Sequence, residues 1–393
     1  MRTRTQVAII GAGPAGLVLA NVLAAAGVEC VVVEHRSREH VEARARAGFL
    51  EQRTVECLRR HGLAGRLLER AARHVCCEFR CASRSFSVPY GELAGGRSHW
   101  VYPQHELVRD LLDVLTARGV QPLFSHAAIA VDGVRGETPS VLCRAADGAS
   151  VEIVCDVLAG CDGFHGVARR AIAAAHARTI ERRYPFDWLA VLAEVASPVD
   201  QVVYAMHRDG FAGQMPRTPQ LSRFYLECAP GEMAADWPDE RIWMQLRNRL
   251  GTGGRSAPPV GRVLEKGTLT MRSAVSEPMQ FGRLYLAGDA AHALTPSGAK
   301  GMNLAIADAA VLAEAVIAHV QQRGDELLRG YSAARLPDVW RAQEFSDWLL
   351  TLLHGPDRVG TDHDHEQGLR AARLDQLEHD TAFATAFARR YAG

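Results

Sequence analysis

The chain has 393 residues, a length that corresponds to two or three domains or to one large α/β domain with an insertion. Its 45 lysines and arginines balance 45 aspartates and glutamates, so the sequence argues against nucleic acid or an anionic membrane as a general partner. Nine cysteines, an odd number without a C-x-x-C pair, predict reduced thiols and a cytoplasmic location.

The N-terminal stretch predicts a complete βαβ unit. In "QVAIIGAGPAGLVLANVLAAAGVECVVVE", residues 6–34, a buried strand leads into a glycine turn, an apolar-periodic helix and a second strand. The start of the chain has the outline of a secretory signal, but a signal core has no use for Gly11, Gly13 and Gly16 at this spacing. A dinucleotide-binding unit uses all three.

Each glycine of this unit has a separate expected role. Gly11 permits the turn, Gly13 lets the backbone approach a pyrophosphate, and Gly16 allows close packing of helix and strand. The helix N-terminus offers free N–H groups to phosphate, and Glu34 closes the second strand, where a carboxylate accepts ribose hydroxyls. The alternative is a glycine-rich corner without a ligand, and the motif alone does not distinguish NAD from FAD.

The pattern of the chain changes twice further on. Residues 1–75 and 96–182 carry α/β patterning, whereas short alternating strands with Gly and Pro turns begin near residue 191 and predict an antiparallel sheet. Helical periodicity returns at residue 302 and continues to the end. The polar segment "TDHDHE", residues 361–366, is interpreted as a solvated turn, and no metal is expected.

A second glycine-rich stretch, "GRLYLAGDAAHALTPSGAKGMNLAIADA", occupies residues 282–309. A short strand runs into Asp289, and a loop that contains Pro296 then opens a helix near Asn303. An acidic residue at a strand end can hold a ribityl or ribose hydroxyl, and a helix N-terminus can face the electron-rich edge of an isoalloxazine. The two loops are therefore expected to bind the two ends of one FAD. The alternative is a structural turn before a surface helix.

Three short motifs now occur in a fixed order: "GAGPAG", "GCDGFHGVARR" and "GDAAHALTPSGAKGMN". They resemble the fingerprints of single-component FAD-dependent aromatic hydroxylases. The stretches between them, among them "RARAGFLEQ", "YPFDWLAVLAE" and "DERIWMQLRNRL", resemble the 4-hydroxybenzoate 3-monooxygenase family over essentially the whole chain.

The resemblance implies an α/β fold with an α+β insertion: a non-contiguous FAD-binding domain, an antiparallel β-sheet substrate domain and C-terminal helices. The expected FAD-binding domain comprises residues 1–75, 96–182 and 268–345. The substrate domain would comprise residues 76–95 and 183–267, and the C-terminal helical region residues 346–393.

The resemblance also implies an activity. The enzyme would use NADPH or NADH and O2, through a flavin C4a-hydroperoxide, to hydroxylate a 4-hydroxybenzoate-type acid ortho to a ring hydroxyl. A phenol reacts well only after its hydroxyl loses its proton, and an unperturbed tyrosine-like phenol titrates near about 10. By resemblance, Tyr204 donates to the phenolate oxygen, Tyr391 lies behind it, and His74 passes the proton to solvent. Without the resemblance these side chains would be read as core residues.

The carboxylate end of the substrate is expected to meet Arg217, whose planar guanidinium fits a planar carboxylate, and Tyr225. Pro296 corresponds to the residue whose carbonyl faces the phenol, and Asn303 to the one that links its loop to the flavin.

The sequence departs from the family pattern at the carboxylate end. Met215 stands where a serine is usual, Gly213 where a bulkier apolar residue is usual, and Thr295 replaces a proline. These departures predict tolerance of an extra ring substituent, so 3-amino-4-hydroxybenzoate is an alternative substrate.

The remaining cofactor positions also come from the resemblance. It implies that FAD is bound by Gly11, Gly13, Gly16, Glu34, Arg44, Arg46, Gln104, Asp289, Gly298, Gly301, Met302 and Asn303. Arg223 and Lys300 match basic residues that favour anionic reduced flavin. Arg46, His165 and Arg272 match contacts of the nicotinamide cofactor, while Arg36 and Arg38 could hold a 2′-phosphate, which favours NADPH.

Two other classes of protein remain as alternatives. An NAD-dependent dehydrogenase would explain only the first loop, and a non-catalytic flavin-binding protein would leave Arg217, Tyr204 and Tyr391 unexplained. The expected partners are a small aromatic acid and O2, with a homodimer as a possibility and without nucleic acid or membrane.

Overall fold

The computed structural model describes residues 2–43, 48–81, 84–175, 178–196, 201–322, 324–355 and 361–393. The predicted FAD ligands Arg44 and Arg46 lie outside these residues. The chain divides into two compact units: the first is Met1–Ala71, Tyr102–Arg182 and Ser273–Glu344, and the second is Ala72–Val101, Arg183–Arg272 and Phe345–Gly393. The C-terminal residues, expected as a region of their own, fall in the second unit.

The first unit contains two sheets and most of the helices around them. Its elements are β1 (Arg2–Arg4), β2 (Val7–Ile10), α1 (Pro14–Ala25), β3 (Cys30–Val33), α2 (Arg38–Ala43), β4 (Phe49–Glu51), α3 (Gln52–Arg60), α4 (Gly65–Arg70), α6 (Gln104–Ala117), β9 (His126–Asp132), β10 (Ser140–Ala145), β11 (Ser150–Val154), β12 (Val157–Gly160), α7 (Val167–Ala175), β18 (Gln280–Phe281), β19 (Leu284–Leu286), η2 (Gly288–Ala290), β20 (His292–Ala293), η3 (Pro296–Gly298) and α9 (Gly301–Gln322).

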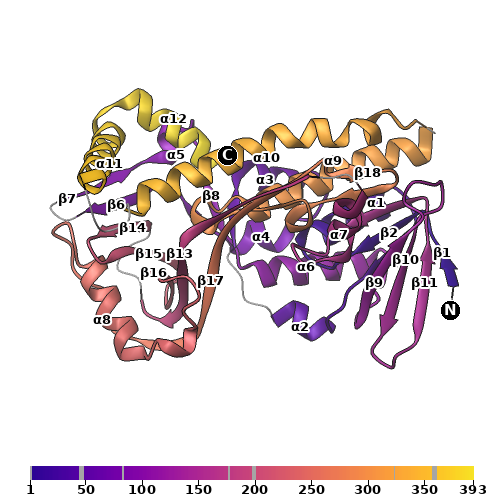
Figure 1. Ribbon diagram of the computed structural model, residues 1–393, viewed down its shortest axis with the longest axis horizontal. Helices are drawn as coiled ribbons and strands as arrows, with labels where there is room; N and C mark the ends of the chain where they lie inside the picture. Colours follow the sequence, from indigo (N-terminus) through magenta and orange to yellow (C-terminus); the bar gives the residue numbers. More distant parts are fainter. Residues whose placement is uncertain are drawn as a thin grey trace. The chain divides into compact units, whose positions relative to one another are not determined.

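The main sheet of this unit has the strand order β18-β19-β12-β2-β3, and β19, β12, β2 and β3 run parallel. All of β2 is buried, as a parallel strand covered on both faces requires. Helix α1 is apolar almost all round and packs against both α9 and α6. Figure 1 shows the second sheet, in which β1 joins β11, β10 and β9 beside the N-terminus. The predicted βαβ unit is therefore present.

The second unit is built around one large sheet. Its elements are β5 (Ala72–His74), β6 (Cys77–Cys81), β7 (Arg84–Val88), α5 (Tyr90–Leu93), β8 (His99–Val101), β14 (Val202–His207), β15 (Gly210–Thr218), β16 (Leu221–Cys228), η1 (Ala234–Asp236), α8 (Asp239–Leu250), α11 (Thr361–His379) and α12 (Thr381–Ala392). Strands β13 (Arg178–Glu194) and β17 (Arg262–Glu277) and helix α10 (Glu326–Leu353) contribute residues to both units.

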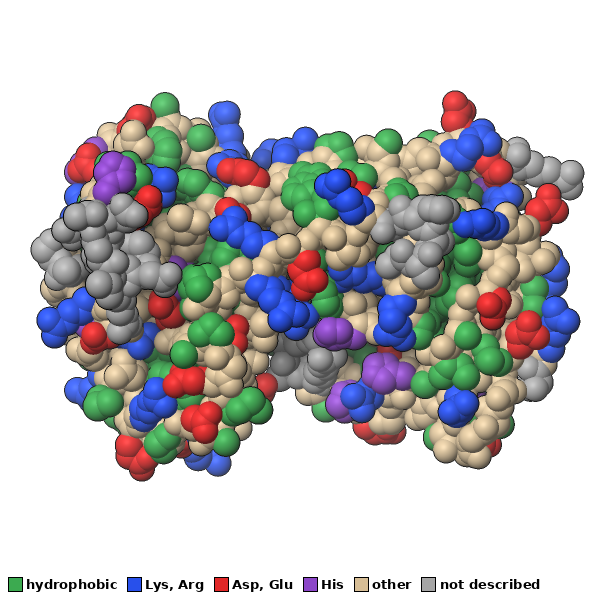
Figure 2. Space-filling view, viewed as in Figure 1, with side chains coloured by type: hydrophobic (Ala, Val, Ile, Leu, Met, Phe, Trp, Pro, Cys, Tyr) green, Lys and Arg blue, Asp and Glu red, His purple; other side chains and the backbone are tan. Residues whose placement is uncertain are grey.

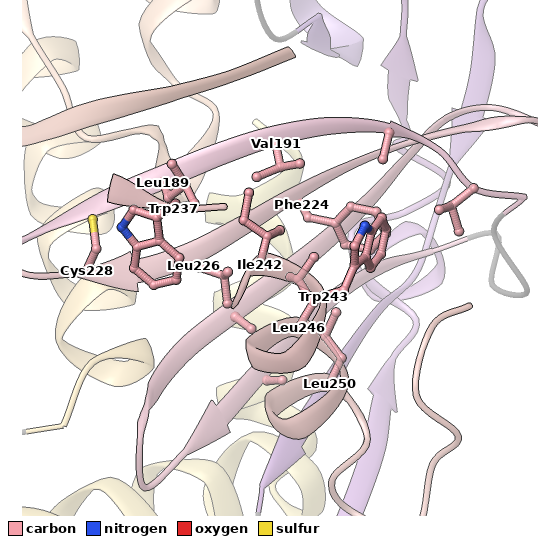
Figure 3. Packing of buried hydrophobic residues seen from close by; sticks show 14 of the residues in the cluster. Leu189, Val191, Phe224, Leu226, Cys228, Trp237, Ile242, Trp243, Leu246 and Leu250 are labelled. Atoms are coloured by element: carbon pink, nitrogen blue, oxygen red, sulfur yellow. The ribbon is translucent and has the colours of Figure 1, made fainter. Parts of the chain in front are cut away.

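The large sheet has the order β17-β13-β16-β15-β14-β6-β7 within the second unit. The pairs β13–β16, β16–β15 and β15–β14 are antiparallel, as the alternating sequence pattern predicts, whereas β14 and β6 run parallel. One face of the sheet is closed by η1 and α8. Figure 3 shows Trp243, Leu246 and Leu250 of α8 packed on Phe224 and Leu226 of the sheet. The opposite face carries the predicted substrate contacts and is covered in part by side chains of α12 and of the segment that follows α10.

The segment "TDHDHE" does not form the predicted solvated turn. It begins helix α11, which spans Thr361–His379. Leu374 and Leu377 further along the helix are buried. Packing of these apolar side chains stabilises the helix, and the polar segment forms its first turns. The solvated-turn prediction was wrong.

Helix α9 is the one helix in the described part of the chain that is long and apolar enough to cross a membrane by length and composition. Of its window Gly301–Gln321, 61% is buried in the protein, which matches the core helix of a soluble protein. On the face shown in Figure 2, basic and acidic side chains are interspersed. This distribution agrees with the net charge of zero.

The nine cysteines are free thiols. Burial raises the pKa of seven of them, to about 11 for Cys30 and Cys143 and to about 12 for Cys155 and Cys228. The pKa values of the Cys57, Cys77 and Cys161 thiols are raised for the same reason. These side chains therefore act as small apolar groups of the core.

Candidate functional site

The first glycine loop is shaped by two close backbone approaches and one open position. A Cβ atom on Gly11 would overlap the carbonyl oxygen of Cys161, and a Cβ atom on Gly16 would overlap the carbonyl oxygen of Gly11. At Gly13, which precedes helix α1, a Cβ atom would have no neighbour within 4 Å among the described residues. Gly11 and Gly16 thus serve the packing, and the space at Gly13 fits a pyrophosphate above the helix N-terminus.

Glu34 at the end of β3 is tied to this loop. Its carboxylate accepts the N–H of Ala12 at 2.9 Å on Oε2 and the N–H of Arg36 at 2.9 Å on Oε1, and His35 Nδ1 lies 2.8 Å from Oε1. Oε2 keeps a lone pair for a further donor. The orientation of the carboxylate is therefore fixed by the protein, which suits the binding of a ribose hydroxyl.

The second glycine loop is fixed by hydrogen bonds to a buried carboxylate. Asp308 of α9 accepts the N–H of Gly288 at 3.0 Å, His292 Nε2 at 2.6 Å and Arg335 Nε at 2.8 Å. Burial acts to raise the pKa of Asp308, but His292 and Arg335 outweigh it and hold the pKa below its ordinary value. Asp289 lies exposed on the loop that this network fixes.

The helix that follows this loop begins at Gly301, after η3 with Pro296 and Gly298. Asn303 Oδ1 accepts the N–H of Glu51 at 2.9 Å, and its Nδ2 donates to the carbonyls of Phe49 at 3.1 Å and Ala299 at 2.8 Å. The amide of Asn303 thus joins the loop to strand β4.

Lys300 forms a buried ion pair with Glu51, whose other oxygen accepts Arg53 Nε. Burial acts to raise the pKa of Glu51, but the two cations lower it overall. The charge of Lys300 is therefore compensated inside the protein, which weakens the expectation that it favours an anionic flavin.

The middle fingerprint, "GCDGFHGVARR", leads into helix α7. Asp162 Oδ2 accepts the N–H of Ala168 at 3.1 Å, and burial raises the pKa of Asp162. A Cβ atom on Gly166 would overlap that carboxylate. The motif therefore caps a helix. His165, the predicted nicotinamide contact, lies beside it with its ring 4.9 Å from that of Phe164.

The open face of the large sheet carries a row of predicted substrate contacts. Tyr204 of β14 is paired with Gly213 of β15, and Gly213 is paired with Tyr225 of β16. Paired residues lie on the same face of a sheet, and here it is the face opposite to α8. The glycine therefore lies between the two tyrosines.

Two buried hydroxyls meet at one end of this row. The hydroxyl oxygens of Tyr204 and Tyr391 are 2.8 Å apart, and either can be the donor. Burial raises the pKa of both phenols above their ordinary value. They therefore stay protonated near neutral pH and can pass a proton along the hydrogen bond without ionising.

The other end of the row carries positive charge. Burial lowers the pKa of the Arg217 guanidinium, and the Tyr225 hydroxyl acts in the opposite direction. Arg223 lies 3.7 Å from Glu265 and its charge is partly compensated. Glu265 acts on Arg217 as well, and Arg217 remains the predicted partner of a substrate carboxylate because it is electrostatically coupled to Tyr225.

Aromatic side chains form the wall beside Gly213. A Cβ atom on Gly213 would lie 3.0 Å from Cζ of Phe211, whose ring stacks on Trp188 at a centroid distance of 4.8 Å. Trp188 Nε1 donates to His354 Nε2 at 2.9 Å, and His354 Nδ1 lies 2.7 Å from a carboxylate oxygen of Glu227. The expected free volume at Gly213 is thus partly filled by Phe211, because the glycine makes room for that ring.

The other predicted positions are distributed over both units. Gln104 begins α6, Met302 lies in α9, and His74 ends β5 as a buried side chain. Met215 is buried on β15, and Arg272 belongs to the second unit. Sequence reasoning missed the supporting residues Asp308, His292, Arg335, Glu51, Trp188, Phe211, Glu227 and His354.

The fixed nucleotide loop and the second loop in front of α9 are features of a flavin-dependent oxidoreductase. A family model described as FAD binding domain matches residues 4–346. The chain is 37% identical to p-hydroxybenzoate hydroxylase of Acinetobacter baylyi, over 99% of this chain and 95% of that protein. The chain belongs to this family of FAD-dependent aromatic monooxygenases.

Other relatives agree with this membership. A 3-amino-4-hydroxybenzoate 2-monooxygenase of Streptomyces platensis is 31% identical over 90% of each chain. The crystal structure of p-nitrophenol 4-monooxygenase of Pseudomonas putida has the same fold, with a TM-score of 0.85, 20% identity and coverage of 100% of this chain and 99% of that one. The predicted fold class, FAD with an NAD(P)H donor and the monooxygenase class are confirmed, in preference to a dehydrogenase.

Proposed function

We propose that this monooxygenase hydroxylates a 4-hydroxybenzoate-type acid ortho to a ring hydroxyl. The observation that carries the proposal is the row Tyr204–Gly213–Tyr225 on one sheet face, with Tyr391 behind the first tyrosine and Arg217 next to the last. A proton-passing group and a fixed cation at opposite ends of a row match a ring with its hydroxyl para to its carboxylate.

Binding would use charge at one end of the ring and hydrogen bonds at the other. Arg217 offers a planar guanidinium to the carboxylate, and Tyr225 offers a hydroxyl beside it. Tyr204 takes the proton of the substrate phenol as its own proton moves to Tyr391 across the 2.8 Å hydrogen bond. Tyr391 gives up its own proton in the same step, toward His74 and solvent, so neither tyrosine is left charged.

The flavin, once bound, would supply the activation of O2 for transfer to the ring. Gly13 and the N-terminus of α1 would hold its pyrophosphate, Glu34 its ribose and Asp289 its ribityl chain. The buried aromatic wall of Trp188 and Phe211 would exclude water from the ring. We further propose NADPH as the donor, held in part by His165 and Arg272, and a cytoplasmic protein that can form a homodimer.

A ring-substituted acid, such as 3-amino-4-hydroxybenzoate, is the second candidate substrate. Met215 offers a flexible, polarizable side chain near the carboxylate end, and Gly213 carries no side chain of its own. The Streptomyces relative, whose name includes this acid, supports the candidate.

The test is NAD(P)H oxidation by the purified, flavin-loaded enzyme with a panel of substituted 4-hydroxybenzoates and with benzoates that lack the 4-hydroxyl. Product analysis would identify the position of the new hydroxyl. We expect stimulation only by acids with both para groups. Equal stimulation by benzoate would contradict the proposal.

A further inference from the structure

Behind Tyr391 lies a histidine that the proposed function does not use. The ring of His99, at the start of β8, has its centroid 5.0 Å from that of Tyr391 and is inclined to it by 81°. His99 is fully buried, with 0% of its surface exposed. A titratable ring without solvent contact thus lies directly against the second tyrosine of the hydroxyl pair.

A second histidine continues this path. Strands β5 and β8 are antiparallel, and His74 is paired with His99 in their register. Side chains of directly paired residues lie on one face with Cβ atoms about 5 Å apart. His74 is 5% exposed, so it is closer to solvent than His99. The four residues therefore follow one another as neighbours in the order Tyr204, Tyr391, His99 and His74.

We propose that His99 is a proton-relay residue that connects Tyr391 with His74. The inference rests on the proposed function, because it needs a substrate phenol that loses its proton on binding. The substrate gives its proton to Tyr204 as the Tyr204 proton moves to Tyr391. The Tyr391 proton moves to one ring nitrogen of His99, the proton on its other nitrogen moves to His74, and His74 releases one to water.

An imidazole suits this position for a chemical reason. It can accept a proton on one nitrogen while it releases another from the opposite nitrogen. A tyrosine hydroxyl must accept and release protons at the same oxygen. The titratable groups that face His99 and Tyr391 are Tyr90 of α5, Tyr204 of β14, His74 of β5 and Cys77 of β6. Burial raises the pKa of the Tyr90 and Cys77 side chains, so both remain neutral near pH 7.

Packing is the competing explanation, and the structure offers a matched control for it. Tyr90 packs against both His99 and Tyr391, with ring centroids 5.3 Å and 4.9 Å away. The change Tyr90→Phe keeps this ring, and the proposed relay does not pass through its hydroxyl. A variant that only disturbs packing would affect Tyr90 and His99 alike.

The experiment follows ionisation of the substrate by stopped-flow absorbance when 4-hydroxybenzoate or its 3-amino analogue is mixed with FAD-loaded enzyme between pH 6 and 9. Variants His99→Leu and His99→Gln are compared with Tyr90→Phe and with His126→Gln, a histidine of the first unit. We expect about 100-fold slower ionisation in both His99 variants, the lower end of the contribution of a positioned proton-transfer group. The substrate Kd should change little, and both controls should keep the original rate.

The outcomes distinguish a wrong substrate class from a wrong proton relay. If the unaltered enzyme ionises neither acid, the proposed substrate class is wrong. If it ionises one of them and a folded His99 variant does so at the same rate, the relay is wrong. Equal slowing in the His99 variants and Tyr90→Phe would assign His99 to packing. If His99→Leu does not fold, the more polar His99→Gln decides.

Discussion

The hydroxyls of Tyr204 and Tyr391 lie 2.8 Å apart although 187 positions separate them in the chain. Tyr204 comes from the centre of the large sheet and Tyr391 from the last turn of α12. Asp380 caps that helix by accepting the N–H groups of Ala382 and Phe383. The C-terminal helix is therefore part of the second unit and positions one of the two linked hydroxyls.

Removal of the first hydroxyl should uncouple the enzyme. In Tyr204→Phe, flavin reduction continues to some extent, but the ring is not activated, so reducing equivalents end as hydrogen peroxide. The ratio of hydroxylated product to NAD(P)H consumed measures this loss. The control is Tyr184→Phe. It removes a hydroxyl of β13 that donates to Asp347, and this variant should stay coupled. Full coupling in Tyr204→Phe would refute the role of the tyrosine pair.

Loss of the cation should weaken substrate binding without preventing flavin binding. For Arg217→Ala we expect a loss of about 3 kcal/mol in binding free energy, because a charge-assisted hydrogen-bonded pair disappears. Arg217→Lys should recover only part of it, since an ammonium does not match the carboxylate fork. Titration of the flavin absorbance with substrate gives both Kd values. An unchanged Kd in Arg217→Ala would remove this residue from the site.

Substitution of Gly13 and of Gly16 by valine should have different effects. Gly13→Val fills open space and should lower FAD retention while the apoprotein stays folded, whereas Gly16→Val overlaps the carbonyl of Gly11 and should destabilise the fold itself. Flavin content and thermal unfolding distinguish the two. FAD in the unaltered protein should be released completely by acid precipitation, since its binding is non-covalent; flavin left on the protein would contradict this.

Substrate choice should depend on Met215 and on the Gly213–Phe211 pair. We expect kcat/KM for 3-amino-4-hydroxybenzoate to be at least comparable with that for 4-hydroxybenzoate. Met215→Ser combined with Gly213→Leu should shift the ratio toward the unsubstituted acid by about tenfold, the lower range for a change of pocket size. Phe211→Leu in the same background would relieve the contact with the new leucine. Strict preference of the unaltered enzyme for 4-hydroxybenzoate would contradict this expectation.

The stability of the protein should fall on mild acidification through His354. Burial lowers the pKa of His354; burial raises that of Glu227, but its hydrogen bond with His354 lowers it overall. The unfolded chain binds more protons at His354, because a histidine titrates there near about 6.5, so the stability contributed by neutral His354 is complete above that pH and decreases below it. The contribution of Glu227 decreases only below about 4.3 and does not change in this range. Urea unfolding at pH 8 and pH 5.5 measures the effect.

His354→Leu is the complementary variant. It leaves the Trp188 N–H and the Glu227 carboxylate without their partner and should cost about 2 kcal/mol at pH 8. It should also flatten the dependence on pH. An unchanged pH dependence would show that other groups are responsible.

The flavin half could be predicted because its signals are local. Gly11, Gly13, Gly16 and Glu34 lie within one βαβ unit, and their spacing reflects backbone approaches that only glycine permits. Asp308 had a weaker signal: it is one of two carboxylates, with Glu314, in the apolar run of α9, and a carboxylate in such a run indicates a buried partner. Its partner Arg335 gave no such signal.

The substrate half depends on contacts between distant positions, which spacing does not encode. His354 and Glu227 are 127 positions apart, and nothing in the sequence indicates their hydrogen bond. The space at Gly213 could not be judged either, because it depends on the direction in which the Phe211 ring points. The family resemblance therefore named the residues of the row, whose roles stay predictions, whereas the side chains that support the row were missed.

The burial of the thiols has a consequence for an oxygenase whose failed turnovers release hydrogen peroxide. Peroxide oxidises the thiolate form of cysteine, and burial keeps seven of the nine thiols protonated at cellular pH. Cys161, directly beneath the flavin loop, is among them. These seven thiols are therefore poor targets for peroxide, and oxidation of cysteine under poor coupling should be confined to Cys76 and Cys81.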